Sequence, residues 1–94
     1  MKWEKGSPET SAISTAEAID GRRFSVLPNQ QYDFQPVRGY LLYDEKSLHL
    51  FSKEGKPLLG LGTFCAIGVP RSAVFKSVQD AQRTAEKVAG VAQW

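Results

Sequence analysis

Residues 40–64 read YLLYDEKSLHLFSKEGKPLLGLGTF, and this stretch decides the fold. Its three apolar runs, at 40–43, 48–51 and 58–64, are separated by clusters of charged residues and glycine. Short apolar runs between such clusters are typical of β-strands joined by tight turns. The stretch therefore predicts three consecutive antiparallel strands.

An alanine-rich helix is predicted after these strands, at residues 77–92. Ser77 stands at the N-cap position, and Asp80 in the first turn suits both capping and the helix dipole. Gly90 is a candidate for an earlier end of the regular helix. One buried face is expected, because apolar residues recur at a spacing of three to four: Val78, Ala81, Ala85, Val88, Ala89 and Ala92.

Small residues predict a close contact between this helix and the last strand. Gly60 and Gly62 share one face of the strand, and Ala85 and Ala89 lie on the buried face of the helix. A bulky side chain at any of these positions should overpack, at a cost of about 1–3 kcal/mol.

Two interpretations compete for residues 11–27. Ser14 and Glu17 have the spacing of a capping box, which favours a short helix. Asp20-Gly21 is instead among the best two-residue hairpin turns. We favour the hairpin, because a helix that ends before the glycine has barely one turn. Its inward side chains are then Ile13, Ile19, Phe24 and Val26.

The other segments are a polar N-terminal arm at 1–10, anchored by Trp3, and two proline-containing loops at 28–36 and 65–75. Together the segments predict one domain over residues 1–94. Its class is α+β, an antiparallel sheet of about five strands with the C-terminal helix packed on one face.

Composition and charge limit the class of protein. Hydrophobic residues make up 41% and charged residues 23% of the 94, close to ordinary globular values. The single Cys65 excludes an internal disulfide and a cysteine-based zinc site. Neither a signal peptide nor an apolar run of roughly 20 residues is present, so we expect a cytoplasmic protein with no membrane partner.

The net charge of +2 is unevenly distributed. Up to Lys46 the chain has six basic and seven acidic residues, and from Ser47 onward it has six basic and three acidic residues. Nucleic-acid binders usually carry a denser basic patch, so nucleic acid is an alternative partner rather than the first one.

No catalytic or metal-binding signature is present, so we expect neither an enzyme nor a cofactor. His49 is the only histidine, and no neighbouring Ser or Cys in the sequence pairs with it, which favours a structural or surface role. A dyad of His49 with Cys65 is the alternative, although a cysteine after an apolar run is usually buried. The acidic residues are too scattered to coordinate a metal.

Two surfaces are candidates for binding. The first is a sheet face with Tyr43, His49 and Phe51, suited to stacking bases or seating a protein. Its alternative is a face covered by the N-terminal hairpin and Trp3. The basic residues that rim this face are Arg22, Arg23, Lys53 and Lys56.

The second surface is the loop at 65–75, where Arg71 follows Pro70. Proline stiffens the backbone, and arginine offers a bidentate contact. We predict that replacing Arg71 and Lys53 together by alanine weakens partner binding and leaves the melting temperature nearly unchanged. The alternative is a tolerated surface insertion.

Four short motifs follow one another in a fixed order and together span most of the chain. They are Trp3, Asp20-Gly21-Arg22 before Phe24, Leu61-Gly62-x-Phe64, and the run from Phe75 through Ser77, Ala81 and Ala85 to Glu86. In this order the chain resembles small uncharacterised proteins of phage and prophage genomes, except that residues 65–74 intervene before the helix. The resemblance implies a non-catalytic protein in the host cytoplasm that binds a host protein or ribonucleoprotein complex. Anti-CRISPR inhibitors of host defence are proteins of this kind.

The order of three strands and a helix is also similar to the plant-type and integrase-arm DNA-binding domains. Those domains read the major groove with arginines and a tryptophan, whereas the matching strands here carry leucine and tyrosine, and Lys53 and Lys56 lie at a turn. A small nucleic-acid-binding module is therefore the alternative function, and a virion structural or assembly component is a third.

Overall fold

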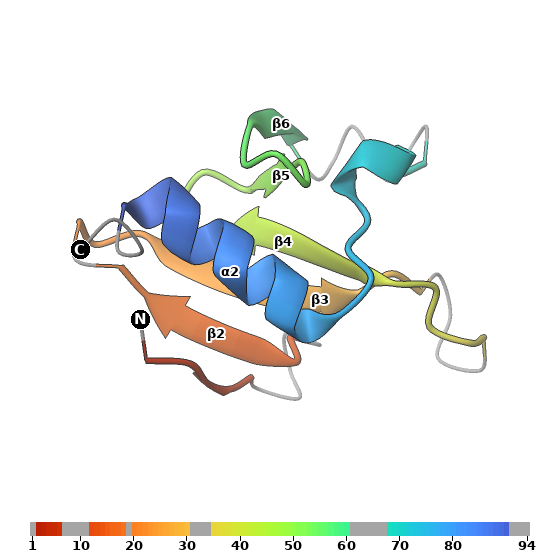
Figure 1. The fold of residues 1–94 in the computed structure, drawn as a ribbon, viewed down its shortest axis with the longest axis horizontal. Helices are drawn as coiled ribbons and strands as arrows, with labels where there is room; N and C mark the ends of the chain where they lie inside the picture. The colour runs from red at the N-terminus through yellow and green to blue at the C-terminus, as the bar shows by residue number, and fades with distance from the viewer. Residues whose placement is uncertain (1, 7–11, 19, 31–34, 61–67, 91–94) are drawn as a thin grey trace.

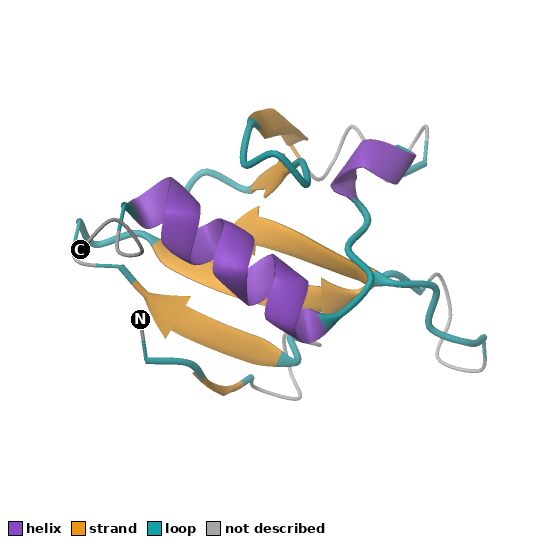
Figure 2. Cartoon of the chain, in the orientation of Figure 1, coloured by secondary structure: helices purple, strands orange, loops and turns teal. Residues whose placement is uncertain are grey.

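The computed structural model describes residues 2–6, 12–18, 20–30, 35–60 and 68–90. These residues form an antiparallel six-stranded sheet with helix α2 across one face (Figure 1), so the predicted α+β class is confirmed with one strand more than expected. Neighbouring strands in the sheet follow one another along the chain (Figure 2). The strands are β1 (Glu4–Lys5), β2 (Ser14–Glu17), β3 (Arg23–Pro28), β4 (Tyr40–Asp44), β5 (His49–Phe51) and β6 (Pro57–Gly60).

The predicted hairpin at Asp20-Gly21 joins β2 to β3. Glu17 pairs with Arg23 across the turn, and Gly21 has a φ of +89°, which glycine adopts readily. The competing short helix is wrong, because Ser14–Glu17 is a strand. The additional strand β1 lies in the predicted N-terminal arm and pairs with β2.

The helix-facing core comes from alternate residues of β3 and β4. Val26 pairs with Leu42, and both are fully buried together with Phe24 on the side that α2 covers. Ser14 pairs with Val26, so the preceding Ile13 lies on the other face and is 38% exposed. The expectation that Ile13 points inward is therefore wrong.

Helix α2 (Val78–Ala89) has the predicted N-cap. The hydroxyl of Ser77 accepts a hydrogen bond of 3.1 Å from the backbone N–H of Asp80, and Gly90 ends the helix with a φ of +79°. The helix thus stops before the predicted end at 92; residues 91–94 are outside the described residues. Ala81 and Ala85 are fully buried, as their spacing predicts.

The glycine that approaches α2 is Gly55, in the β5–β6 turn, and not Gly60. A Cβ on Gly55 would lie 3.0 Å from Cγ2 of Val88, whereas at Gly60 the nearest atom is the carbonyl oxygen of Leu48 at 3.5 Å. The helix packs mainly on β3 and β4. The predicted contact at Gly60 is wrong, and Gly62 is outside the described residues.

Residues 68–77, the described part of the connection that leads to α2, are more regular than the loop predicted at 65–75. They contain the 3-10 turn η2 (Arg71–Ala73), and Phe75 forms an antiparallel bridge with Tyr40 at the start of β4. Residues 61–67, with the rest of the predicted third strand and Cys65, are outside the described residues. On the sheet face away from α2, a second small cluster joins β4 and β5 to this connection: Leu41 and Leu50, with Leu27, Tyr43, Leu58, Val69 and Val74 against them.

Candidate functional site

A basic groove lies where three segments meet: the start of β4, the β5–β6 turn, and η2 with the residues that follow it. Its volume is about 410 Å³, and it opens broadly to solvent. Four of its described lining residues are cationic and none is acidic. We call it the basic groove, and its lining residues are Arg38, Gly39, Lys53, Arg71, Val74, Phe75 and Lys76.

Backbone hydrogen bonds bring these three segments together. Tyr40 and Phe75 exchange two bonds of 2.9 and 2.8 Å, which fasten the connection to the first residue of β4. The N–H of Lys53 donates a bond of 2.7 Å to the carbonyl oxygen of Ser72 and so ties the β5–β6 turn to η2. The positions of the cations are therefore set by main-chain contacts, which are independent of the side chains that carry the charge.

Arg38 and Gly39 form one wall of the groove, and Asn29, directly after β3, holds this wall in place. Its carbonyl oxygen accepts a bond of 3.0 Å from the N–H of Arg38, and its side-chain amide donates one of 3.0 Å back to the Arg38 carbonyl. A third bond, of 2.9 Å, runs from the Asn29 N–H to the carbonyl oxygen of Gly39.

Residues 74–76 form the opposite wall, which lies so close to Gly39 that a larger residue would not fit at position 39. Gly39 has a φ of +95°, and a Cβ there would collide with Cγ1 of Val74 and would lie 2.8 Å from the carbonyl oxygen of Phe75. The side chain of Val74 and the backbone of Phe75 can therefore pack directly against the main chain of Gly39. Val74, which is half-buried, supplies an apolar floor among the cationic lining residues.

Among the described residues, no carboxylate forms a salt bridge with a cation of the groove. The salt bridges of the described residues join Arg22 to Asp20, Arg23 to Glu45 and Arg83 to Asp80, and none of them involves a groove cation. Clustered charges of one sign raise the local potential and attract counter-ions.

The groove unites two of the predicted binding residues and adds two that were missed. Arg71 and Lys53, which the sequence analysis paired, both line it. Arg38 and Lys76 were not singled out, because one precedes a strand and the other precedes a helix cap. Their sequence neighbours could have indicated them. Arg38 precedes the turn residue Gly39, and Lys76 precedes the N-cap residue Ser77, and each neighbour fixes where its segment bends.

Two further predicted binding residues lie outside the groove. Lys56 is exposed in the β5–β6 turn, where its backbone pairs with Ser52. Arg22 is held at the hairpin tip, 2.7 Å from the Asp20 carboxylate and 5.3 Å above the Phe24 ring, and also donates to the carbonyl oxygen of Val88 at 3.4 Å. Its backbone N–H, and then its side chain, lower the pKa of Asp20. Arg22 therefore links the hairpin to the end of α2.

The predicted face of Tyr43, His49 and Phe51 does not exist as one surface. Tyr43 pairs with Leu50, so Phe51 lies on the opposite side of the sheet from Tyr43. Phe51 is only 4% exposed, and its ring centre lies 5.6 Å from that of Phe24 in the core under α2. The expectation of an uncovered aromatic face is wrong. The alternative was a face covered by the N-terminal hairpin and Trp3, and Trp3 does pack against the same core as Phe51.

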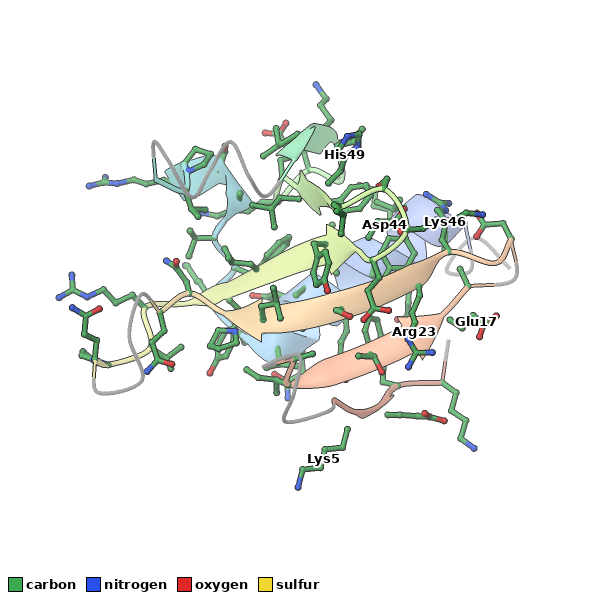
Figure 3. All side chains as sticks on the ribbon, turned by 180° about the vertical axis from the view of Figure 1, so that it is seen from behind. Lys5, Glu17, Arg23, Asp44, Lys46 and His49 are labelled. Carbon is green, nitrogen blue, oxygen red and sulfur yellow. The ribbon has the colours of Figure 1, made fainter. Side chains whose placement is uncertain are left out.

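His49 is exposed at the start of β5. Figure 3 shows it on the β5–β6 side of the sheet, away from Arg23 and Glu17 on the β2 side. The predicted alternative, a dyad with Cys65, involves a residue that is outside the described part of the chain.

Tyr43 belongs to a polar cluster on the face away from α2. The hydroxyl of the buried Ser25 donates a bond of 2.7 Å to Glu45, whose other carboxylate oxygen lies 3.0 Å from the Arg23 guanidinium. Burial, and secondly the negative charge of Glu45, raise the pKa of the Tyr43 hydroxyl above its ordinary value, while Ser25 acts in the opposite direction. The arginine of this cluster is thus neutralised, whereas the salt bridges between described residues include no cation of the basic groove.

Within the described ranges, no group of three or more His, Cys, Asp or Glu side chains is arranged to hold a metal ion. The same ranges contain no helix with the length and hydropathy needed to cross a bilayer. No protein-family model matches this chain, and neither a curated protein nor a solved structure is significantly similar to it.

Proposed function

We propose that this protein is a non-catalytic binding module that holds an anionic macromolecule in the basic groove. The observation that carries the proposal is the convergence of four cationic side chains from three separate segments, with no acidic residue among the described lining. Unpaired cations around an open groove attract an anionic partner and orient it during encounter.

The chemistry of the lining supports binding rather than catalysis. Its polar side chains are those of lysine and arginine, which bind anions as cations at neutral pH. Nucleophilic catalysis needs a nucleophile and a base that activates it, and the described lining contains no Ser, Cys, His, Asp or Glu.

The resemblance to small phage and prophage proteins favours a partner from the host. On this proposal the protein acts in the host cytoplasm on a protein or ribonucleoprotein complex, in the manner of an anti-CRISPR inhibitor. A small nucleic-acid-binding module is the second candidate, and it is favoured by the same four cations, since phosphates are bound largely by lysine and arginine.

Affinity capture from a bacterial host lysate tests the proposal with three baits. They are the natural chain, the groove variant Lys53→Ala with Arg71→Ala, and a control variant Lys46→Ala with Arg83→Ala. The control removes one lysine and one arginine outside the groove; Figure 3 shows Lys46 at the far end of the sheet from η2.

We expect the natural chain and the control variant to retain the same macromolecule and the groove variant to lose it. Added salt should weaken this capture, because screening acts on exposed charges. Equal retention by all three baits would exclude the basic groove as the binding site.

A further inference from the structure

We infer that the ligand of the basic groove is an acidic segment of a partner protein that inserts an apolar side chain between the cations. This inference rests on the proposed function and names the class of ligand. It follows from the combination of an apolar floor with a cationic rim, which a binding site for phosphate alone does not require.

The floor is the first reason. Val74 is half-buried and lies against Gly39, where the absence of a Cβ lets the two walls meet. An apolar side chain in such a position loses its water on binding, while the surrounding charged residues form a rim that excludes solvent. A sugar-phosphate backbone is polar and charged, and it offers no branched aliphatic side chain to fill this position.

The aromatic residue of the groove is the second reason. Binding of single-stranded nucleic acid commonly relies on stacking of bases on exposed aromatic faces. Phe75 is the aromatic residue among the described lining, and it is only 3% exposed because its ring belongs to the core under α2. A base therefore has no ring face in this lining on which to stack.

The distribution of the arginines is the third reason. Outside the groove, Arg22, Arg23 and Arg83 are each paired with a carboxylate. The described arginines without a salt bridge, Arg38 and Arg71, both line the groove. The whole chain carries a net charge of only +2. Nucleic-acid surfaces present an extended basic stripe along the phosphate chain, whereas a local cluster of cations matches a short acidic segment.

The two arginines define the acidic side chains that fit. Arg38 and Arg71 come from different walls of the groove, and each guanidinium can bind a carboxylate in a bidentate manner. A segment with carboxylates on both sides of one apolar residue satisfies the rim and the floor together.

Solution NMR of the full chain labelled with ¹⁵N tests this inference with four probes. The first is an acetylated and amidated peptide of sequence Glu-Asp-Leu-Asp-Glu. The second replaces its leucine by serine, and the third replaces each acidic residue by its amide. The fourth is a short oligothymidylate, which supplies phosphates and bases without an acidic peptide.

We expect the leucine peptide to shift amide signals at residues 38–39, 53 and 71–76. The serine peptide should bind roughly tenfold more weakly, because the apolar contact is lost, and the amide peptide should not bind measurably. The Lys53→Ala, Arg71→Ala variant should bind the leucine peptide roughly tenfold more weakly than the Lys46→Ala, Arg83→Ala control.

Two results would overturn the inference and leave the proposed function standing. One is tighter binding of oligothymidylate than of the leucine peptide at the same amides, which would make nucleic acid the ligand. The other is equal binding of the leucine and serine peptides, which would show that the floor takes no apolar side chain. If no probe shifts the groove amides, the proposed function itself is contradicted.

Discussion

The backbone N–H of Lys53 lies 2.7 Å from the carbonyl oxygen of Ser72, and this hydrogen bond joins the β5–β6 turn to the residue next to Arg71. The bond uses main-chain atoms alone, so it survives when the lysine side chain is shortened. The structure of the groove and its charge can therefore be changed separately.

The double variant Lys53→Ala, Arg71→Ala should keep its stability. Both side chains belong to exposed residues without a salt bridge among the described residues, so the free energy of unfolding should change by less than about 0.5 kcal/mol. Thermal unfolding followed by circular dichroism, beside the Lys46→Ala, Arg83→Ala control, measures this. A loss as large as that of a core substitution would show that these cations are structural.

Gly39→Ala should destabilise the fold much more than Gly21→Ala. Both glycines have positive φ, which costs another residue about 1–2 kcal/mol. A Cβ at Gly21 meets no atom within 4 Å, but at Gly39 it meets Val74 and the backbone of Phe75, which adds about 1–3 kcal/mol of overpacking. Urea denaturation of the two variants gives the difference. Similar losses would mean that the walls of the groove can separate freely.

Leu48→Gly should stabilise the protein. Leu48 has a φ of +62°, which strains the backbone of a residue with a side chain. Its side chain is 54% exposed, so little hydrophobic burial offsets this strain. Relief of about 1–2 kcal/mol of strain exceeds the roughly 0.5–1 kcal/mol that glycine costs through the freedom of the unfolded chain. The midpoint of urea unfolding should rise, and a lower midpoint would indicate that the exposed leucine makes a stabilising contact.

The ionisation of Tyr43 should make the fold less stable at alkaline pH. Burial and Glu45 raise the pKa of Tyr43 in the folded state, so the folded protein holds this proton more tightly than the unfolded chain. The resulting stability is present below the ordinary tyrosine pKa near 10 and is lost as the pH rises through the folded-state pKa.

Ultraviolet difference titration of the natural chain and Tyr43→Phe should isolate this late ionisation. Glu45→Gln should move it to lower pH, because the neighbouring negative charge is removed. An ionisation of Tyr43 at or below its ordinary pKa would contradict the prediction.

Phe51→Ala should cost about 3–5 kcal/mol of stability, as expected for removal of a buried ring beside Phe24. Denaturant unfolding measures the loss. At a temperature where the variant is folded, capture of the partner should be unchanged, since Phe51 faces the core and not the basic groove. A selective loss of capture without a loss of stability would restore Phe51 as a binding residue.

Local signals in the sequence predicted the parts of the fold that depend on neighbouring residues. The turn at Gly21 and the N-cap at Ser77 are both present, because positive φ and a capping hydroxyl act within a few residues. The burial of Ala81 and Ala85 followed from helical spacing. Ile13 was assigned to the wrong face of the sheet, because a shift of one residue along a strand moves every side chain to the opposite face.

Local signals in the sequence did not predict which residues pack against the helix. Gly60 was expected beneath α2, but the helix lies on β3 and β4, and Gly55 approaches it from a turn. Phe51 was expected on an open surface for a similar reason: alternation along a strand separates two faces without saying which of them is covered.

The sequence by itself determined the α+β class, the hairpin, the helix and its cap, since these follow from propensities and spacings along the chain. It also singled out Arg71 and Lys53, through a stiff loop and a charged turn. Only the tertiary structure decided that they share a groove with Arg38 and Lys76, because residues distant in sequence are brought together by the Tyr40–Phe75 bridge and the Lys53–Ser72 bond. Such pairings depend on which surfaces the whole chain buries, and no local preference encodes them.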